Sequence, residues 1–148
     1  MKIVVFIVML LLSSPTYAND IAIQTICYEA QTEPYSGQLA VARVIRNRML
    51  KRSKTAFEVC LQPRQFSCWN KDDHNYKVIK GVIKGRLWEV CIGVAIVVMQ
   101  SAEKHNPVVG VKHYYDKSLD SNPPYWAEEG EYMAVYGVNN LRLIRGVR

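Results

Sequence analysis

A carboxylate stands at the end of an apolar helical pattern, immediately before a break in the chain. Glu29 follows Ile21, Ile23, Ile26 and Cys27, which recur at largely helical spacing. Pro34 disfavours helical geometry at the residue before it, so the helix should end near residue 31 or 32. A carboxyl group among apolar neighbours can have its pKa raised and act as a general acid. Glu29 is therefore the first candidate for a catalytic residue.

The loop Gln62–Asn70 contains groups that suit a sugar ligand. Aromatic rings stack on the apolar faces of sugars, and side-chain amides bond to hydroxyl and acetamido groups. Gln65, Phe66 and Trp69 are the candidates for substrate binding. The alternative is that the two aromatic residues only anchor the loop to the core, and for Phe66 alone this alternative is favoured.

A second polar and aromatic region lies nearer the C-terminus. Residues 110–116 include His113 and Tyr114, and the proline-rich segment that follows includes Trp126. These residue types could line a cleft and contact substrate, and ordinary packing is the alternative for each of them.

Other catalytic classes have weaker patterns in this chain. The three histidines show no HExxH motif and no ligand-like partner at i+2 or i+4, so we expect no metal site and no cofactor. No G-x-S-x-G motif is present. A cysteine nucleophile would need a free thiolate with a histidine partner. The even number of cysteines and an N-terminus that predicts export both disfavour a free thiolate.

The four cysteines indicate disulfides, since their number is even and the chain begins like an exported protein. Three pairings are possible. The close pair Cys60–Cys68 would close a short loop, and Cys27–Cys91 would then join two helices. Buried free thiols remain an alternative for Cys27 and Cys91.

The periodicity predicts a mainly helical protein with long ordered loops. Helices are expected from Asp20 to about residue 31, from Ser36 to about residue 52, from a capping box at Thr55 to about residue 60, and over 86–103. The β-branched residues of the last segment would also permit a strand. Residues 108–115 are expected to be extended, and 132–136 and 141–144 are ambiguous.

The N-terminus predicts export. Residues 1–18 have a lysine, ten apolar residues and small residues before Asn19, which is typical of a signal peptide; an uncleaved anchor is the alternative. Residues 19–148 would form one compact domain. The net charge of +6 suits anionic polymers of the cell envelope, or serves only solubility. No basic, aromatic cluster indicates nucleic-acid binding.

Three blocks of sequence resemble the SleB-type cell wall hydrolases. They are the EA…EP…G…AVA.VI.NR pattern of residues 29–48, the tripeptide Gln65–Ser67, and the pairs His113–Tyr114 and Pro124-x-Trp126. Relatives in this family include spore cortex-lytic enzymes and proteins encoded by bacteria and phages. The resemblance covers nearly the whole chain after the signal peptide.

The resemblance implies a lysozyme-like, mainly α fold with few short strands, and cleavage of the glycan strands of peptidoglycan by a periplasmic or secreted monomer. It implies lytic transglycosylase chemistry with Glu29 as the essential glutamate. Glu33 matches the second acidic position and is a candidate for substrate binding, Gln65 matches the substrate-facing glutamine and Tyr114 a tyrosine of the cleft. The alternatives are a hydrolytic muramidase, with Glu33 or Asp116 as second carboxylate, an N-acetylmuramoyl-alanine amidase, and an inactive disulfide-stapled envelope protein that binds glycan or inhibits an enzyme.

Overall fold

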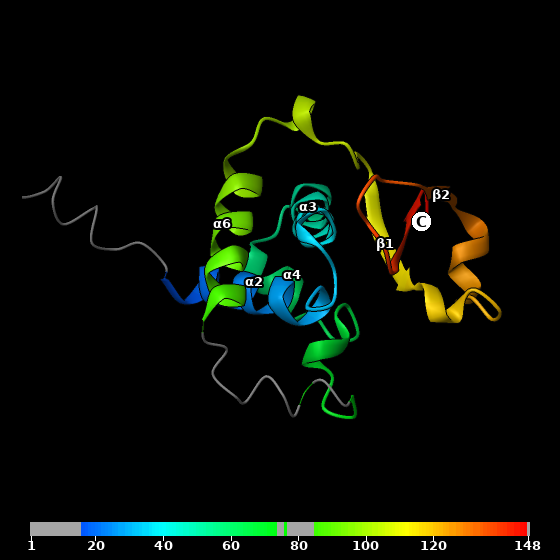
Figure 1. Ribbon diagram of the computed structural model, residues 1–148, viewed down its shortest axis with the longest axis horizontal. Helices are drawn as coiled ribbons and strands as arrows, with labels where there is room; N and C mark the ends of the chain where they lie inside the picture. The colour runs from blue at the N-terminus through cyan, green and yellow to red at the C-terminus, as the bar shows by residue number, and fades with distance from the viewer. Residues whose placement is uncertain (1–15, 74–75, 77–84, 148) are drawn as a thin grey trace, which may run out of the picture.

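A group of helices packs beside a small antiparallel sheet (Figure 1). The computed structural model describes residues 16–73, 76 and 85–147. The helices are α2 (Thr16–Glu29), α3 (Tyr35–Arg52), α4 (Ala56–Cys60) and α6 (Arg86–Gln100), and the strands are β1 (Val111–Asp116), β2 (Glu131–Met133) and β3 (Leu141–Arg145). The short 3-10 turns are η1 (Ser67–Trp69), η2 (Glu103–His105), η3 (Lys117–Leu119) and η4 (Tyr125–Glu129). This is the mainly α architecture with few short strands that the resemblance implies.

The first two helices meet at the break that Pro34 introduces. Helix α2 ends at Glu29, two or three residues before the predicted end, and it begins at Thr16 rather than Asp20, because no glycine or proline interrupts residues 16–20. Helix α3 begins at Tyr35, one residue before the expected start at Ser36, and Pro34 is its N-cap. The fixed φ of proline suits a helix start. The predicted signal peptide lies outside the described residues up to residue 15.

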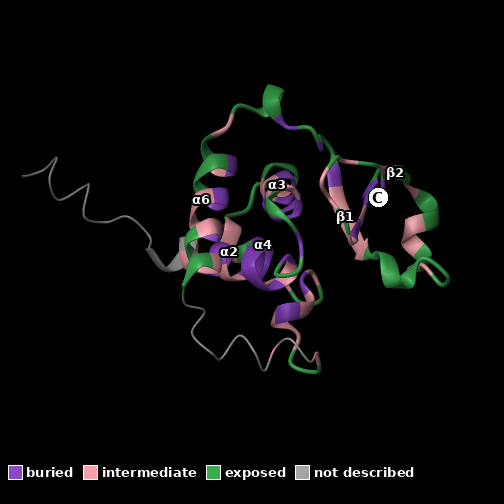
Figure 2. Ribbon diagram, viewed as in Figure 1, coloured by how far each residue is buried: buried purple, intermediate pink, exposed green. Residues whose placement is uncertain are grey.

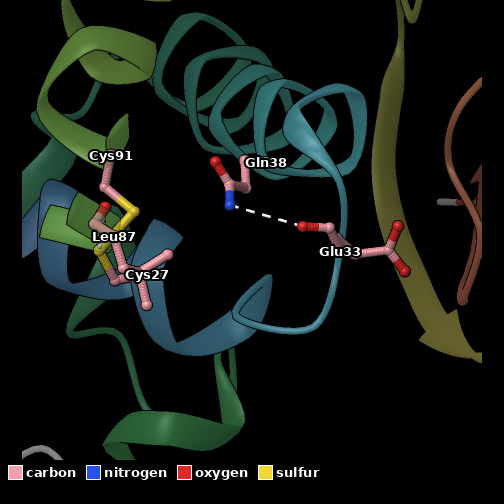
Figure 3. Close-up of a disulfide and its surroundings, with 5 residues drawn as sticks. All are labelled: Cys27, Glu33, Gln38, Leu87 and Cys91. Atoms are coloured by element: carbon pink, nitrogen blue, oxygen red, sulfur yellow. Dashed lines mark hydrogen bonds between the residues drawn. A yellow bond between two sulfur atoms is a disulfide. The ribbon is translucent and has the colours of Figure 1, made fainter. Parts of the chain in front are cut away.

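Helix α6 confirms the helical interpretation of residues 86–103, although it ends at Gln100. Its residues Cys91, Val94, Ala95 and Val98 are buried against α2 and α3. The disulfide Cys27–Cys91 joins α2 to α6, as predicted (Figure 3). Arg46 of α3 donates from Nη1 to the carbonyl of Val98 at 2.6 Å, which ties the third helix to this pair.

The capping box predicted at Thr55 is confirmed. The Thr55 hydroxyl accepts from the Glu58 backbone N–H at 3.2 Å, and the Glu58 carboxylate accepts from the Thr55 N–H at 2.9 Å. These bonds satisfy two of the unpaired donors at the start of α4. Helix α4 places Val59 and Cys60 in the core beneath α2.

The sheet has the order β1-β3-β2, with both pairs antiparallel. The two segments that were ambiguous in the sequence are β2 and the central strand β3, whose Leu141, Leu143 and Ile144 are buried. Strand β1 packs against α3, which lies between the other helices and the sheet (Figure 1). Helices and strands share one hydrophobic cluster, and the exposed residues lie mainly on the outer surfaces (Figure 2).

Helix α3 is joined to the sheet by buried amides. Asn47 donates from Nδ2 to the carbonyls of Val108 at 2.9 Å and Val111 at 2.8 Å. Its Oδ1 accepts from Asn106 Nδ2 at 2.9 Å. These bonds fix the start of β1 on the helix, since each buried polar group is satisfied. None of the helices in the described part of the chain is long and apolar enough to cross a membrane.

Cys60 and Cys68 are free thiols in the structure, so the predicted bond between them is not formed. Both are fully buried, and their thiols bond to different side chains one turn apart on α2, Cys60 to Thr25 and Cys68 to Glu29. Burial raises the pKa of Cys60 to about 11 and raises the pKa of Cys68 still further, so both are protonated at neutral pH. The short sequence separation of Cys60 and Cys68 suggested a disulfide, but it could not show that each thiol has a different partner on α2.

Candidate active site

Glu29 accepts hydrogen bonds from two distant segments of the chain. Its Oε1 accepts from the Ser67 hydroxyl at 3.1 Å and from the Cys68 backbone N–H at 3.0 Å. Its Oε2 accepts from the Tyr114 hydroxyl at 2.7 Å. The end of α2, the turn η1 and strand β1 therefore meet at this carboxyl group, which is half-buried.

A cavity of about 370 Å³ opens beside this carboxyl group. It lies between the helices and one end of the β1–β3 pair, and its volume is within the range of small-molecule sites. The predicted Glu29, Gln65 and Tyr114 all line it. The full lining consists of Tyr28, Glu29, Arg48, Gln65, Ser67, Tyr114, Tyr115, Asp116, Leu119 and Leu141.

Arg48 organises the wall of the cavity. It is 5% exposed, and it donates from Nε to the Lys112 carbonyl at 2.7 Å and from Nη1 to the Gln65 carbonyl at 3.1 Å. Its guanidinium lies 4.7 Å from the centroid of the Phe66 ring. Arg48 thus connects α3 to the Gln65 loop and to β1. The planar fork of donors in arginine suits this bridging role.

Gln65 turns its side chain toward α3. Its Oε1 accepts from Arg52 Nη1 at 3.0 Å, and the same group donates to Gln62 Oε1 at 3.0 Å. Arg48 and Arg52 lie one turn apart on α3. Arg48 holds the backbone of Gln65, and Arg52 holds its side chain. The Gln65 side chain is half-buried and available at the cavity wall.

Tyr114 remains a neutral hydrogen-bond donor at neutral pH. Its pKa is raised well above the ordinary value, first by burial and then by the adjacent Glu29 carboxylate. Both effects disfavour a second negative charge beside Glu29. The hydroxyl therefore keeps its proton and points at Oε2.

Glu33 lies elsewhere, although the sequence placed it among the substrate-binding candidates. It is 6% exposed, with Oε2 accepting from the Asn139 N–H at 2.9 Å and Oε1 from the Asn140 N–H at 2.6 Å. Its carbonyl accepts from Gln38 Nε2, and its carboxylate points away from the disulfide (Figure 3). Both oxygens are used, and Glu33 is not in the cavity lining. Its contacts tie the α2–α3 turn to the chain before β3.

Phe66 and Trp69 are anchors of their loop. Phe66 is 2% exposed beneath Arg48, so its ring faces no solvent. Trp69 donates from Nε1 to the Thr25 hydroxyl at 2.9 Å, and Thr25 donates to the Ile21 carbonyl at 2.7 Å. Neither ring lines the cavity. Both rings have partners on the helices, which agrees with the alternative that they anchor the loop to the core.

His113 and Trp126 pair with each other outside the cavity lining. Their ring centroids are 5.2 Å apart, and Trp126 also meets Tyr115 edge-on at 6.1 Å. Burial, together with the nearby cations Arg48 and Lys112, lowers the pKa of His113 to about 4. His113 is therefore neutral at neutral pH, and this aromatic group supports β1 from the side opposite Tyr114.

Arg48, Ser67 and Tyr115 line the cavity but were not predicted to have a role in it, although Arg48 and Ser67 stand in the motifs that carry the family resemblance. The signal for Arg48 was its position, since Val41, Val44, Ile45 and Arg48 recur at i, i+3, i+4 and i+7 on the apolar face of α3. A charged residue on such a face needs polar partners in the core. Among the described residues, no group of three or more His, Cys, Asp or Glu side chains is placed to hold a metal ion.

A family model described as Cell Wall Hydrolase matches residues 32–140. The chain therefore belongs to this family, which confirms the resemblance seen in the sequence. Membership places the protein among the peptidoglycan-degrading hydrolases. Gln65 and Tyr114 lie in the matched range, and Glu29 lies three residues before it. Comparisons with curated proteins and with solved structures give no significant match.

Proposed function

We propose that the protein is a lytic transglycosylase that cleaves the bond between N-acetylmuramic acid and N-acetylglucosamine, with Glu29 as the single acid and base. The observation that carries this proposal is the clamped carboxyl group of Glu29 on the wall of a cavity, with one oxygen bonded to Ser67 and Cys68 and the other to Tyr114. Positioned carboxyl groups of this kind transfer protons to glycosidic oxygens.

The proton to be donated belongs on Oε2. The Cys68 backbone N–H at Oε1 can only donate, so a proton on that oxygen would face another proton. The Tyr114 hydroxyl at Oε2 can either donate or accept, because its O–H rotates. Tyr114 can therefore bond to Glu29 both before and after the proton leaves.

The reaction then needs no second carboxylate. Glu29 gives its proton to the glycosidic oxygen as the bond from that oxygen to C1 of the muramic acid breaks. The C6 hydroxyl of the same sugar attacks C1 and passes its proton to the Glu29 carboxylate. The products are a shortened glycan with a free hydroxyl and a 1,6-anhydro end, and Glu29 is protonated again. No water is consumed.

The test is the product profile of purified protein on peptidoglycan, read by mass spectrometry beside Glu29→Gln. We expect anhydro products from the wild type and a loss of activity of about 100-fold or more in the variant, since general acid–base catalysis supplies this much. The amide can still accept from the Cys68 N–H, so the fold should persist. Undiminished lysis by Glu29→Gln would refute the assignment.

A hydrolytic muramidase is the second candidate, because Asp116 lines the same cavity. Asp116 is exposed, and its Oδ1 accepts from the Ser118 N–H at 2.8 Å, which leaves Oδ2 for other partners. Reducing sugar ends from the wild type, lost in Asp116→Asn, would establish this alternative. Anhydro products from both proteins would rule it out.

We propose further that residues 1–18 direct export and are removed, and that residues 19–148 are the catalytic domain. The family membership supports action outside the cytoplasm, where peptidoglycan lies. Mass spectrometry of the protein recovered from the envelope should give a chain that begins at Asn19. A chain that retains the first eighteen residues would favour the uncleaved anchor.

A further inference from the structure

A second cavity opens at the other end of the β1–β3 pair. Asp116 and Leu141, which pair at one end, line the Glu29 cavity, whereas Lys112 and Arg145 lie beside the other end and line a cavity of about 810 Å³. The last turns of α3 complete it through Asn47, Leu50 and Lys51. We call this space, lined also by Glu103, Gly110, Gly146 and Val147, the basic cavity.

Positive charge predominates in the basic cavity. Lys51, Lys112 and Arg145 line it against a single acid, Glu103. Arg145 is paired with Glu131 at 2.5 Å, and Glu103 accepts from Asn106. Lys51 and Lys112 have no ion-pair partner in the described part of the chain. Two ammonium groups, each with three donors, are thus available to an anionic ligand.

The basic cavity lies close to the Glu29 cavity. Arg48 lines the Glu29 cavity, and its neighbour Asn47 lines the basic cavity. On β1, Lys112 and Tyr114 are two residues apart, which separates their Cα atoms by about 7 Å along the strand. A substituent on a sugar bound beside Glu29 therefore has only a short distance to cover.

We propose that the basic cavity binds the carboxylates of the peptide stem that peptidoglycan carries on its muramic acid, through Lys51 and Lys112. This proposal rests on the proposed function, since it assigns a place to a substituent of the same substrate. The stem is the acidic part of the polymer, and it branches from the sugar whose C1 lies at the scissile bond. Leu50 and Val147 offer apolar contact to its aliphatic side chains.

The test measures binding of Glu29→Gln protein, so that no cleavage interferes, to purified sacculi from which phosphate polymers have been removed. The same binding is measured on glycan stripped of its stems by an amidase. Adding Lys51→Gln and Lys112→Gln should weaken binding to intact sacculi by about tenfold, because two charge contacts that face solvent are lost. Binding to stripped glycan should not change.

A matched control carries Lys54→Gln and Lys71→Gln, which remove the same charge from exposed positions outside the cavity. Lys51→Arg with Lys112→Arg keeps the charge and should bind like the parent. The proposal is wrong if the Gln pair and the control weaken binding equally, if stripped glycan is affected as much as intact sacculi, or if the effect appears only when phosphate polymers are present. Failure of the proposed function would instead show as lysis by Glu29→Gln or as absence of anhydro products.

Discussion

The Glu33→Ala variant should be less stable than the wild type but should keep its lytic activity. Glu33 bonds to the N–H groups of Asn139 and Asn140, at 2.9 and 2.6 Å, across 106 and 107 residues of sequence. A hydrogen bond to a charged group contributes about 1.5–3 kcal/mol. The desolvation of a buried carboxylate offsets part of this sum, so we expect a loss of about 3 kcal/mol in the free energy of unfolding.

The assay is thermal denaturation followed by circular dichroism, with lytic activity measured at 25 °C. A loss of 3 kcal/mol lowers the Tm of a domain this size by about 10 °C. Glu128→Ala removes the same charge from an exposed position and should change stability by less than about 0.5 kcal/mol. Equal melting of the two variants would refute the structural role, and a fully folded but inactive Glu33→Ala protein would show that Glu33 acts on substrate.

Gly37→Ala tests the same contact without removing the carboxylate. A Cβ at residue 37 would lie 2.7 Å from Glu33 Cγ, closer than the two atoms can approach. In an ordinary helix, alanine in place of glycine stabilises by about 1 kcal/mol. Here we expect destabilisation, because Glu33 would be pushed from its two N–H partners. A gain in Tm would contradict the packing described for this turn.

Three further outcomes are expected. Tyr114→Phe should fold normally but lose about 10-fold or more in rate, because one hydrogen bond to the catalytic carboxyl group is removed; an unchanged rate would contradict this role. The pKa of His113 is about 4 in the folded protein and 6.5 when the side chain is exposed. The unfolded chain therefore takes up a proton first, so the stability that His113 contributes is complete above pH 6.5 and is lost as the pH falls toward 4. His113→Phe should flatten that part of the plot of Tm against pH. Alkylation without reductant should find two thiols per chain after denaturation and none before, from Cys60 and Cys68; finding none after denaturation would show that they form a disulfide.

The sequence alone predicted the parts of this protein that depend on neighbouring residues. Helical spacing and the effect of Pro34 placed Glu29 at the end of a helix, and the capping box located α4. The family also followed from the sequence, and Cys27–Cys91 was among the three pairings that the sequence left open. These features are local, or they are carried by residues in a fixed order, so a pattern can express them.

Only the tertiary structure decided which polar and aromatic groups face the cavity. Glu33 finds its donors more than a hundred residues away, and Phe66 and Trp69 meet Arg48 and Thr25 on other helices. No spacing in the chain encodes such contacts, because they depend on how α2, α3 and β1 pack together. The type of a side chain showed what chemistry it can perform, and its partner in the fold decided whether it is free to perform it.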